Sequence, residues 1–299
     1  MAYIIENANI LKNKGLTTSS LLIQDNRIAA IQSRFKRYRL IKMSLEPFIM
    51  SPSFIMLNSE IPAKGSFQEL KKFMIDHLLV KGCTTLLTYV TVSFEEELAG
   101  KLAEMHTALI SSPIDFIIGI KIPIRLITPG FIRKCKKEKV PAIFVELSSP
   151  EEIAKVPWGW IRDALFPFNC PLIPIISTVK KKEAKPLLSK WKDTMIKEKI
   201  PAIHEEITEN LPLSVPILNK IGVYPKKASL LVGSELSYNL YFRSTENMNV
   251  DEVDLFHYHG DRLVLTVHKG KIVRSGEEVL FKPGYGEYVK VQTPSYFSL

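Results

Sequence analysis

An almost uninterrupted apolar run extends from Pro47 to Pro62, and it carries no charge before Glu60. The run is long enough for one buried strand and too short to cross a bilayer as a helix. Asn58 and Glu60 stand at alternate positions near its end, and alternate residues of a strand point to the same face of a sheet. If this strand belongs to a barrel, that face is where a functional site would lie.

Both ends of the chain show short apolar segments separated by turn residues. Near the amino terminus these segments are 3–11, 20–24 and 28–31. Near the carboxyl terminus they are 229–232, 240–242, 263–268 and 272–274. The intervening Asn, Asp and Gly residues favour tight turns, so we predict short strands at both ends, with an antiparallel sheet at the amino terminus.

Between these ends, apolar segments alternate with amphipathic stretches, which predicts strands alternating with helices. The predicted helices are 67–81, 93–109 and 129–139, and predicted strands include 84–90, 114–120 and 172–176. One unit is repeated, because 137–146 and 197–206 both read as a basic helix end, a proline and a strand that ends in acid. Such units indicate parallel strands covered by helices, and residues 54 to 220 hold about six of them, whereas a closed barrel takes eight.

Composition places the chain among ordinary globular proteins, since 46% of its 299 residues are hydrophobic and 24% are charged. The amino terminus shows no basic region followed by an apolar core, and no apolar run is long enough to span a bilayer. We therefore expect no membrane partner. Three widely spaced cysteines, Cys83, Cys135 and Cys170, fit reduced thiols, so we expect a cytoplasmic protein.

The net charge of +9 raises the question of a nucleic-acid partner. The basic clusters are 34–39, 134–139 and 180–182 with Lys185. No Gly-rich phosphate loop, zinc-finger spacing or RNA-binding aromatic motif accompanies them. We expect no nucleic-acid partner, because a binding surface would require these three clusters to converge on one face.

The apolar run resembles the first barrel strand of the amidohydrolase superfamily, where a segment of the type V-M-P-G-x-I-D-x-H-x-H supplies two histidines to a metal centre. Pro52 keeps its place in that pattern, while Asn58 and Glu60 stand at the two histidines. Three further segments, 221–234, 268–274 and 282–290, resemble the hydantoinase and dihydropyrimidinase motifs F-G-L-Y-P-K-K-G, R-G-K-V-V and K-P-G-x-G-x-F-V-K. The resemblance covers both ends of the chain and the first half of the middle region.

This resemblance implies an α/β fold, with an incomplete or distorted TIM-like β/α barrel beside a small β-sandwich built from both termini. The sandwich would comprise residues 1–50 and 222–299, and the barrel-like domain residues 51–221. Members of the family hydrolyse cyclic amides with two metal ions, held by the histidine pair, a carbamylated lysine, two more histidines and an aspartate. Here the pair is replaced and the segment 142–147 lacks the lysine, so we expect no catalysis, no metal and no cofactor.

A rebuilt metal site is the alternative, because Glu60, Glu146 and His204 each lie near the end of a predicted strand. Two carboxylates and one imidazole could bind a divalent metal such as zinc. The chain would then be a metal-dependent hydrolase acting on the carbon–nitrogen bonds of cyclic amides. The three residues could equally be solvent-facing side chains at strand ends.

Our main expectation is a non-catalytic, hydantoinase-like protein with a structural or regulatory role. An incomplete barrel leaves strand edges or helix faces uncovered, and association buries them. The expected partner is therefore a second copy of the chain or another protein.

Overall fold

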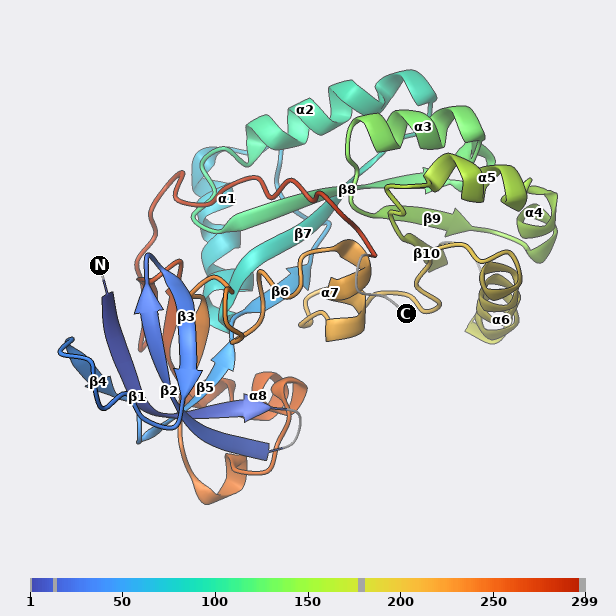
Figure 1. Cartoon of the computed structure of the whole chain (residues 1–299). Helices are drawn as coiled ribbons and strands as arrows, with labels where there is room; N and C mark the ends of the chain where they lie inside the picture. Colours follow the sequence, from blue (N-terminus) through green and yellow to red (C-terminus); the bar gives the residue numbers. More distant parts are fainter. Residues whose placement is uncertain (1, 13–14, 177–180, 296–299) are drawn as a thin grey trace.

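The computed structural model describes residues 2–12, 15–176 and 181–295, and it contains two β-sheets. The first sheet lies at one end of the molecule, and the second is covered by helices that extend toward the other end (Figure 1). None of the described helices is both long and apolar enough to cross a membrane.

The first sheet, sheet A, combines strands from both ends of the chain. Its nine described strands are β1 (Ala2–Lys12), β2 (Gly15–Gln24), β3 (Arg27–Gln32), β4 (Lys42–Ser44), β5 (Phe48–Pro52), β11 (Tyr238–Phe242), β12 (Leu263–His268), β13 (Lys271–Ser275) and β14 (Glu278–Val279). They lie in the order β14-β13-β12-β11-β5-β1-β2-β3, and β4 pairs with β1. The prediction that both termini build one β unit is confirmed.

Strands from both halves of sheet A contribute to one apolar core. Ile5 of β1 and Ile23 of β2 share one cluster with Leu240 of β11 and Val267 of β12. One apolar cluster therefore joins the amino-terminal and carboxyl-terminal strands of sheet A.

The second sheet, sheet B, is parallel throughout and has the order β10-β9-β8-β7-β6. Its strands are β6 (Phe54–Leu57), β7 (Cys83–Thr91), β8 (Asp115–Pro123), β9 (Ile143–Leu147) and β10 (Leu172–Ile176). The described helices are α1 (Phe67–Phe73), α2 (Leu98–Ala108), α3 (Pro129–Lys137), α4 (Pro150–Lys155), α5 (Trp158–Leu165), α6 (Lys181–Lys197), α7 (Val215–Ile221) and α8 (Glu252–Tyr258). Sheet B curls into a half barrel rather than the closed eight-stranded barrel of the TIM fold.

The apolar run 47–62 forms two strands, and the prediction of a single strand is wrong. Residues 48–52 form β5 in sheet A, and residues 54–57 form β6 in sheet B. The chain changes sheets at Ser53, whose buried hydroxyl lies 2.7 Å from that of Thr84 in β7. A continuous apolar run satisfies burial in either sheet, so its pattern could not locate the change.

The predicted helix 67–81 is confirmed as one continuous helical segment. After α1 the chain continues through a π-helical turn at Met74–Leu78 and a 3₁₀ turn at Leu79–Lys81. Gly82 ends the segment with a left-handed φ of 76°. A Cβ atom there would lie 2.6 Å from the side-chain amide of Asn239 in sheet A, so the close approach of the two sheets also requires glycine.

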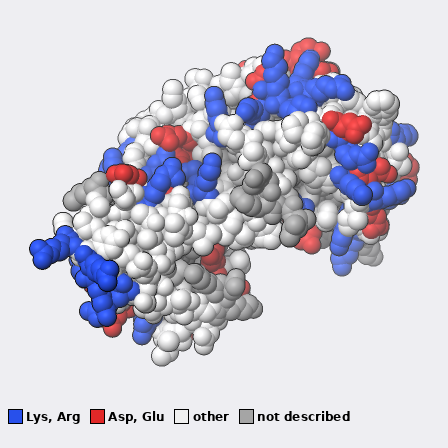
Figure 2. Space-filling view, in the orientation of Figure 1, with Lys and Arg blue, Asp and Glu red and all other residues white. Residues whose placement is uncertain are grey.

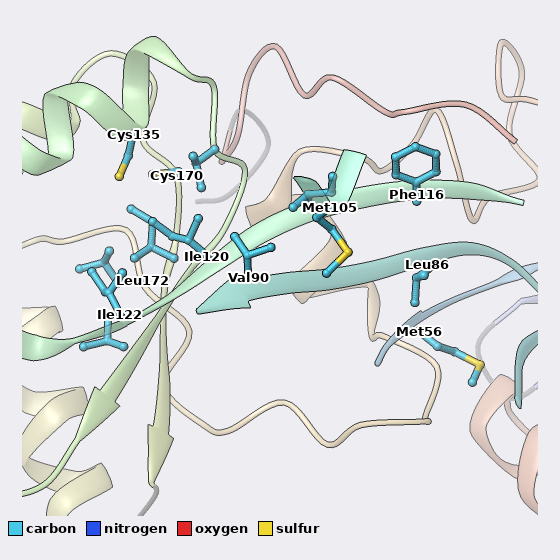
Figure 3. Close-up of a cluster of buried hydrophobic side chains, with 14 of the residues drawn as sticks. Met56, Leu86, Val90, Met105, Phe116, Ile120, Ile122, Cys135, Cys170 and Leu172 are labelled. Atoms are coloured by element: carbon cyan, nitrogen blue, oxygen red, sulfur yellow. The ribbon is translucent and has the colours of Figure 1, made fainter. Parts of the chain in front are cut away.

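Helices cover the convex face of sheet B and form the main apolar core with it. Alternate strand residues such as Met56, Leu86 and Ile120 point into this core, together with Met105 of α2 and Cys135 of α3 (Figure 3). The alternation follows from the two-residue period of a strand, because the neighbours Ile55 and Leu57 belong to a different cluster on the concave face.

The concave face of sheet B is filled by α7 and the carboxyl-terminal segment. Ile55 and Phe144 of the sheet share a cluster with Leu218 and Ile221 of α7 and with Val291. In a complete barrel, inward side chains from further strands fill this space. Here a short helix and a terminal segment fill it instead.

A single crossing segment covers both edges of sheet B. Ala202 pairs with Leu172 of β10 through one bridge, so the strand predicted within the unit 197–206 is reduced to a short contact. The chain then crosses the concave side, and Leu213 donates a backbone hydrogen bond to Ile55 of β6 at 2.8 Å. Both strand edges are therefore protected without the missing barrel units.

The carboxyl-terminal segment also contacts sheet B directly. The backbone N–H of Phe116 donates to Glu287 at 3.0 Å, and that of Val289 donates to Phe116 at 2.9 Å. The carboxyl-terminal segment thus contacts sheet B through residues far apart in the sequence, and the domain boundaries at residues 50 and 222 stay a prediction.

Candidate functional site

Asn58 and Glu60 lie just beyond β6, at the carboxyl end of sheet B. Asn58 is buried; its Nδ2 atom donates to Oδ1 of Asn210 at 2.7 Å, and its Oδ1 atom accepts from the backbone N–H of Glu60 at 2.8 Å. The second bond turns the chain outward, so the Glu60 side chain is exposed. The expectation that both side chains share one face is wrong, because the strand ends at Leu57 and the alternation stops there.

Glu209 closes the same strand end from the crossing segment. Its Oε1 atom accepts a hydrogen bond from the Ser59 hydroxyl at 2.5 Å and one from the Tyr89 hydroxyl at 3.5 Å. Its Oε2 atom accepts from the backbone N–H of Ser59 at 3.3 Å. Burial raises the pKa of Tyr89 above its usual value, so the phenol stays a neutral donor. Sequence reasoning missed this group, because no local pattern links Glu209 to strands 120 or more residues earlier.

Glu146 and Lys121 form an ion pair on neighbouring strands. Lys121 lies in β8 and Glu146 in β9, and their Nζ and Oε1 atoms are 3.5 Å apart. Both side chains are partly exposed. The lysine already supplies the positive charge that a metal ion would bring to this carboxylate.

His204 lies in the crossing segment and lines a surface pocket of about 260 Å³ together with Ser214 and Lys220. Burial, followed by the nearby charges of Lys220 and Lys192, lowers the pKa of His204. The imidazole is therefore neutral at pH 7. The neighbouring Glu206 accepts a hydrogen bond from the backbone N–H of Ile176, at the end of β10, at 2.6 Å.

The structure does not bring Glu60, Glu146 and His204 together as a metal-binding group. Among residues 2–12, 15–176 and 181–295, only one group of three or more His, Cys, Asp and Glu side chains has ligand atoms within 4.8 Å of one another. Its members are Asp115, Glu235 and His268. The rebuilt site remains a prediction without geometric support.

The Asp115 group lies at the opposite end of sheet B from Glu60 and Glu146, since Asp115 is the first residue of β8. Lys227 forms ion pairs with both Asp115 and Glu235, the latter at 2.6 Å. Lys269 pairs with Asp115 at 2.7 Å and with Glu287 at 2.8 Å. The carboxylate oxygens that a metal would need are thus already bonded to two ammonium groups.

His268 completes this buried group. Its Nε2 atom lies 3.5 Å from Oδ1 of Asp115 and has no hydrogen-bond partner among the described residues. Burial alone would raise the pKa of Asp115, but the close approach of His268 and the charge of Lys227 outweigh it and hold that pKa well below its usual value. The group is therefore an ion-pair network between the two sheets, because two lysines and the low pKa of Asp115 keep its carboxylate charged and paired. It is not a set of free metal ligands.

The three cysteines are free and buried, as expected for packed thiols. Burial raises the pKa of Cys83 and of Cys170 to about 12. Because the thiolate is the nucleophile, neither thiol is activated for catalysis.

The basic clusters do not converge. Residues 34–39 lie at the far end of sheet A, beside β4, whereas residues 134–137 belong to α3 in the helix layer (Figures 1 and 2). The third cluster, 180–182, lies outside the residues whose side chains the structure describes. A single nucleic-acid surface would require the basic clusters to lie on one face, and the two described clusters do not.

Comparison with known proteins shows which solved structures share this fold. No family model and no curated protein sequence matches the chain. Solved structures do match it from end to end. A D-hydantoinase matches at 15% identity with a TM-score of 0.58, over 98% of this chain and 99% of that one.

Two more matches agree with the first. The dihydropyrimidinase from Brevibacillus agri has 13% identity and a TM-score of 0.58, over 98% of this chain and 99% of its own. The D-hydantoinase from Thermus sp. has 10% identity and a TM-score of 0.60, over 98% and 100%. The chain thus shares the hydantoinase and dihydropyrimidinase fold, as its motifs indicated.

Proposed function

We propose that this chain is a non-catalytic protein of the hydantoinase and dihydropyrimidinase fold, with a structural or regulatory role through association with itself or with another protein. The observation that carries the proposal is the state of the first strand of sheet B. Where the resemblance places two metal-binding histidines, the chain has a buried asparagine and an exposed glutamate. Both the nitrogen and the oxygen of the asparagine side chain already form hydrogen bonds within the protein.

The residues at this strand end do not fit the metal centre that the resemblance implies. A metal that activates water needs several convergent ligands and an open position. Asn58 uses its oxygen for the Glu60 backbone and its nitrogen for Asn210, and the Glu209 carboxylate accepts three hydrogen bonds. We therefore derive no hydrolytic step for this chain.

The filled concave face also supports a non-catalytic role. Ile221 of α7 and Val291 of the terminal segment are buried there against Phe144. An apolar cluster of this kind stabilises the half barrel and offers a polar cyclic amide no hydrogen-bonding partners.

Exposed aromatic side chains supply a surface for association. Trp160 of α5 and the adjacent Phe166 are each 67% exposed, and α5 lies in the helix layer, far from sheet A (Figure 1). Aromatic residues are enriched where proteins meet, because they bury large areas at low conformational cost. We propose that Trp160 and Phe166 contribute to the interface. We also place the protein in the cytoplasm, in keeping with its free cysteines.

Elemental analysis of the protein, purified without chelators after growth with added zinc and manganese, tests the missing metal centre. We expect less than stoichiometric metal and no hydrolysis of hydantoin or dihydrouracil. A stoichiometric metal that is lost in Glu146→Gln or His204→Ala would overturn the proposal and establish the rebuilt hydrolase site.

Sedimentation velocity over a wide concentration range tests association. We expect a concentration-dependent oligomer that Trp160→Ser weakens, or a monomer that acquires a partner through the same residue. A monomer whose complexes are all unaffected by Trp160→Ser contradicts the assigned surface. Lys190→Ser, on α6, serves as a control of exposed polar character.

A further inference from the structure

The segment 34–43, which connects β3 to β4 and includes the first two residues of β4, is fixed against sheet A by two apolar side chains. Phe35 is buried with Ile4 and Leu22, and Leu40 packs against the same cluster. The backbone N–H of Ile4 donates to the carbonyl of Ile41 at 2.9 Å. These contacts hold the segment on the surface in one orientation. We call residues 34–43 the basic segment.

Four cations of the basic segment point to solvent without ion pairs to other described residues. They are Arg34, Lys36, Arg37 and Arg39, all exposed. The fifth cation, Lys42, pairs with Glu6 at 2.7 Å. No acidic residue occurs between Asp25 and Glu46, and Figure 2 shows the resulting gathering of Lys and Arg at this end of the molecule.

Apolar side chains are exposed among these cations. Ile41 is 67% exposed, Tyr38 47% and Met43 39%. β4 pairs in parallel with β1 through residues 42–44, so Met43 is held by the sheet and is not a side chain of a free terminus. A fixed surface that presents both cations and aliphatic groups has the composition of a peripheral membrane contact.

We propose that the basic segment docks this protein onto an anionic lipid surface. The four unpaired cations would lie at the level of the phosphate headgroups, and Ile41 and Met43 would enter the boundary between headgroups and acyl chains. The expectation of no membrane partner rested on the lack of a segment that could enter or span a bilayer. A peripheral contact with the membrane surface requires no such segment. The proposal is independent of the association surface at Trp160, which lies on the helix layer.

The size of the basic segment favours lipid over a protein partner. A stable protein–protein interface uses about 20–30 residues on each side, and this segment supplies ten. A second copy of the chain is disfavoured as the occupant, because a symmetric contact would bring two sets of unpaired cations together. A fluid bilayer adapts to a small surface and demands no complementary shape.

The exposed side chains also favour lipid over nucleic acid. Single-stranded nucleic acids bind through aromatic side chains on which bases stack. The ring of Tyr38 packs at 89° against the buried Phe35, with ring centroids 5.4 Å apart, and is therefore constrained. Ile41 and Met43 offer no stacking surface, whereas both can enter hydrocarbon.

Each Lys or Arg near a phosphatidylserine-containing surface strengthens binding by about fivefold. Four unpaired cations thus give several hundredfold, and the aliphatic side chains add to this. The expected binding is reversible and sensitive to salt, because surface charges are screened over about 10 Å at 0.1 M ionic strength.

Cosedimentation with phosphatidylcholine vesicles, with or without about 30% phosphatidylserine, tests the proposal. Wild-type protein should bind only the anionic vesicles at about 0.1 M salt. Arg37→Glu/Arg39→Glu should lower the partition coefficient at least about 25-fold. The control Arg133→Glu/Lys137→Glu removes the same charge from exposed residues of α3 and should change it less than threefold.

Ile41→Asp separates lipid from nucleic acid. It should weaken vesicle binding about tenfold or more, since a charge would enter the hydrophobic boundary, and it should leave the thermal unfolding midpoint unchanged because the side chain is exposed. Three results overturn the proposal: no binding of wild type to anionic vesicles, equal losses in the two double variants, or a DNA duplex that competes with the vesicles and binds equally well to Ile41→Asp.

Discussion

The Nζ atom of Lys269 lies 2.7 Å from Oδ1 of Asp115. The pair joins the turn after β12 in sheet A to the first residue of β8 in sheet B, across 154 positions of the sequence. Lys227 reaches the same carboxylate from the segment that follows α7. One buried aspartate therefore ties three distant parts of the chain together.

Asp115→Asn should destabilise the protein by about 3–5 kcal/mol at pH 7, because it leaves two largely buried lysines without their shared carboxylate. Urea unfolding followed by circular dichroism measures the change. The control is Glu246→Gln, which removes an exposed partner of Arg262 and should cost less than about 1 kcal/mol. Equal effects of the two substitutions would show that the buried network contributes no more than a surface pair.

Glu252, at the start of α8, should give the stability of the protein an unusual pH dependence. Burial, followed by the charge of Asp251, raises its pKa to about 7. Between about pH 4.5 and 7, the Glu252 carboxyl is therefore protonated in the folded state and ionised in the unfolded state. Because the folded state binds the extra proton, Glu252 makes the protein less stable as pH rises through this range.

Glu252→Gln should remove this penalty. We expect the variant to exceed the wild type in unfolding free energy by about 2 kcal/mol at pH 8, after allowance for partial exposure, and to equal it near pH 4. Urea titrations at both pH values provide the measurement. A difference that does not change with pH would mean that the carboxyl titrates normally in the folded protein.

Gly286 lies so close to sheet B that only glycine fits. A Cβ atom at this position would be 1.8 Å from the carbonyl oxygen of Ile114 and 2.3 Å from its carbon, which are backbone atoms that cannot rotate away. Gly286→Ala should displace the terminal segment and cost at least about 3 kcal/mol. Gly100→Ala, in α2 with nothing within 4 Å, should stabilise by about 0.5–1 kcal/mol. Thermal unfolding of both variants checks the contrast.

Much of the fold could be predicted from local patterns. The strands at 114–120 and 263–268 and the helix from 67 to 81 are confirmed, because apolar periodicity and a terminal glycine act over a few residues. The strand predicted at 229–232 is wrong. Its segment turns instead, held by the hydrogen bond from the Ser229 hydroxyl to the carbonyl of Pro225 at 2.6 Å, and only Leu230 of the apolar side chains is buried.

The candidate sites were harder to predict, because their contacts join distant positions. The motifs drew attention to the segments that carry Lys227 and Lys269, and the apolar pattern predicted the strand that carries Asp115, but neither gives a sign that the three side chains meet. Likewise, Asn58 was identified from its strand, whereas its partner Asn210 lies 152 positions later. Local patterns report burial and turns, and long-range pairing is set by the packing of the sheets.

The packing of α7 in the half barrel gives a direct test of how the concave face is stabilised. Ile221 is fully buried there, whereas Val215, at the start of the same helix, is 40% exposed. Ile221→Ala should cost about 2–5 kcal/mol because it leaves a cavity, and Val215→Ala should cost less than about 1 kcal/mol. Urea unfolding compares them. Similar costs would indicate that α7 is only loosely attached to sheet B.

Trp158 and Trp160 lie two residues apart in α5 and serve different purposes. Trp158 is buried, its indole N–H donates to the carbonyl of Ile153 at 2.8 Å, and its ring packs edge-on against Trp191. Trp160 points away from this core. Trp158→Ala should therefore cost about 3–5 kcal/mol, and Trp160→Ser should stay within about 0.5 kcal/mol of wild type.

Fluorescence distinguishes the two tryptophans independently of stability. Acrylamide should quench one of the three tryptophans readily in the wild type, and Trp160→Ser should abolish that accessible fraction while Trp191 and Trp158 remain protected. If Trp160 lies in an interface, as proposed, wild-type quenching should fall as the oligomer or complex forms. An accessible fraction that is unchanged on association would place the interface elsewhere on the protein.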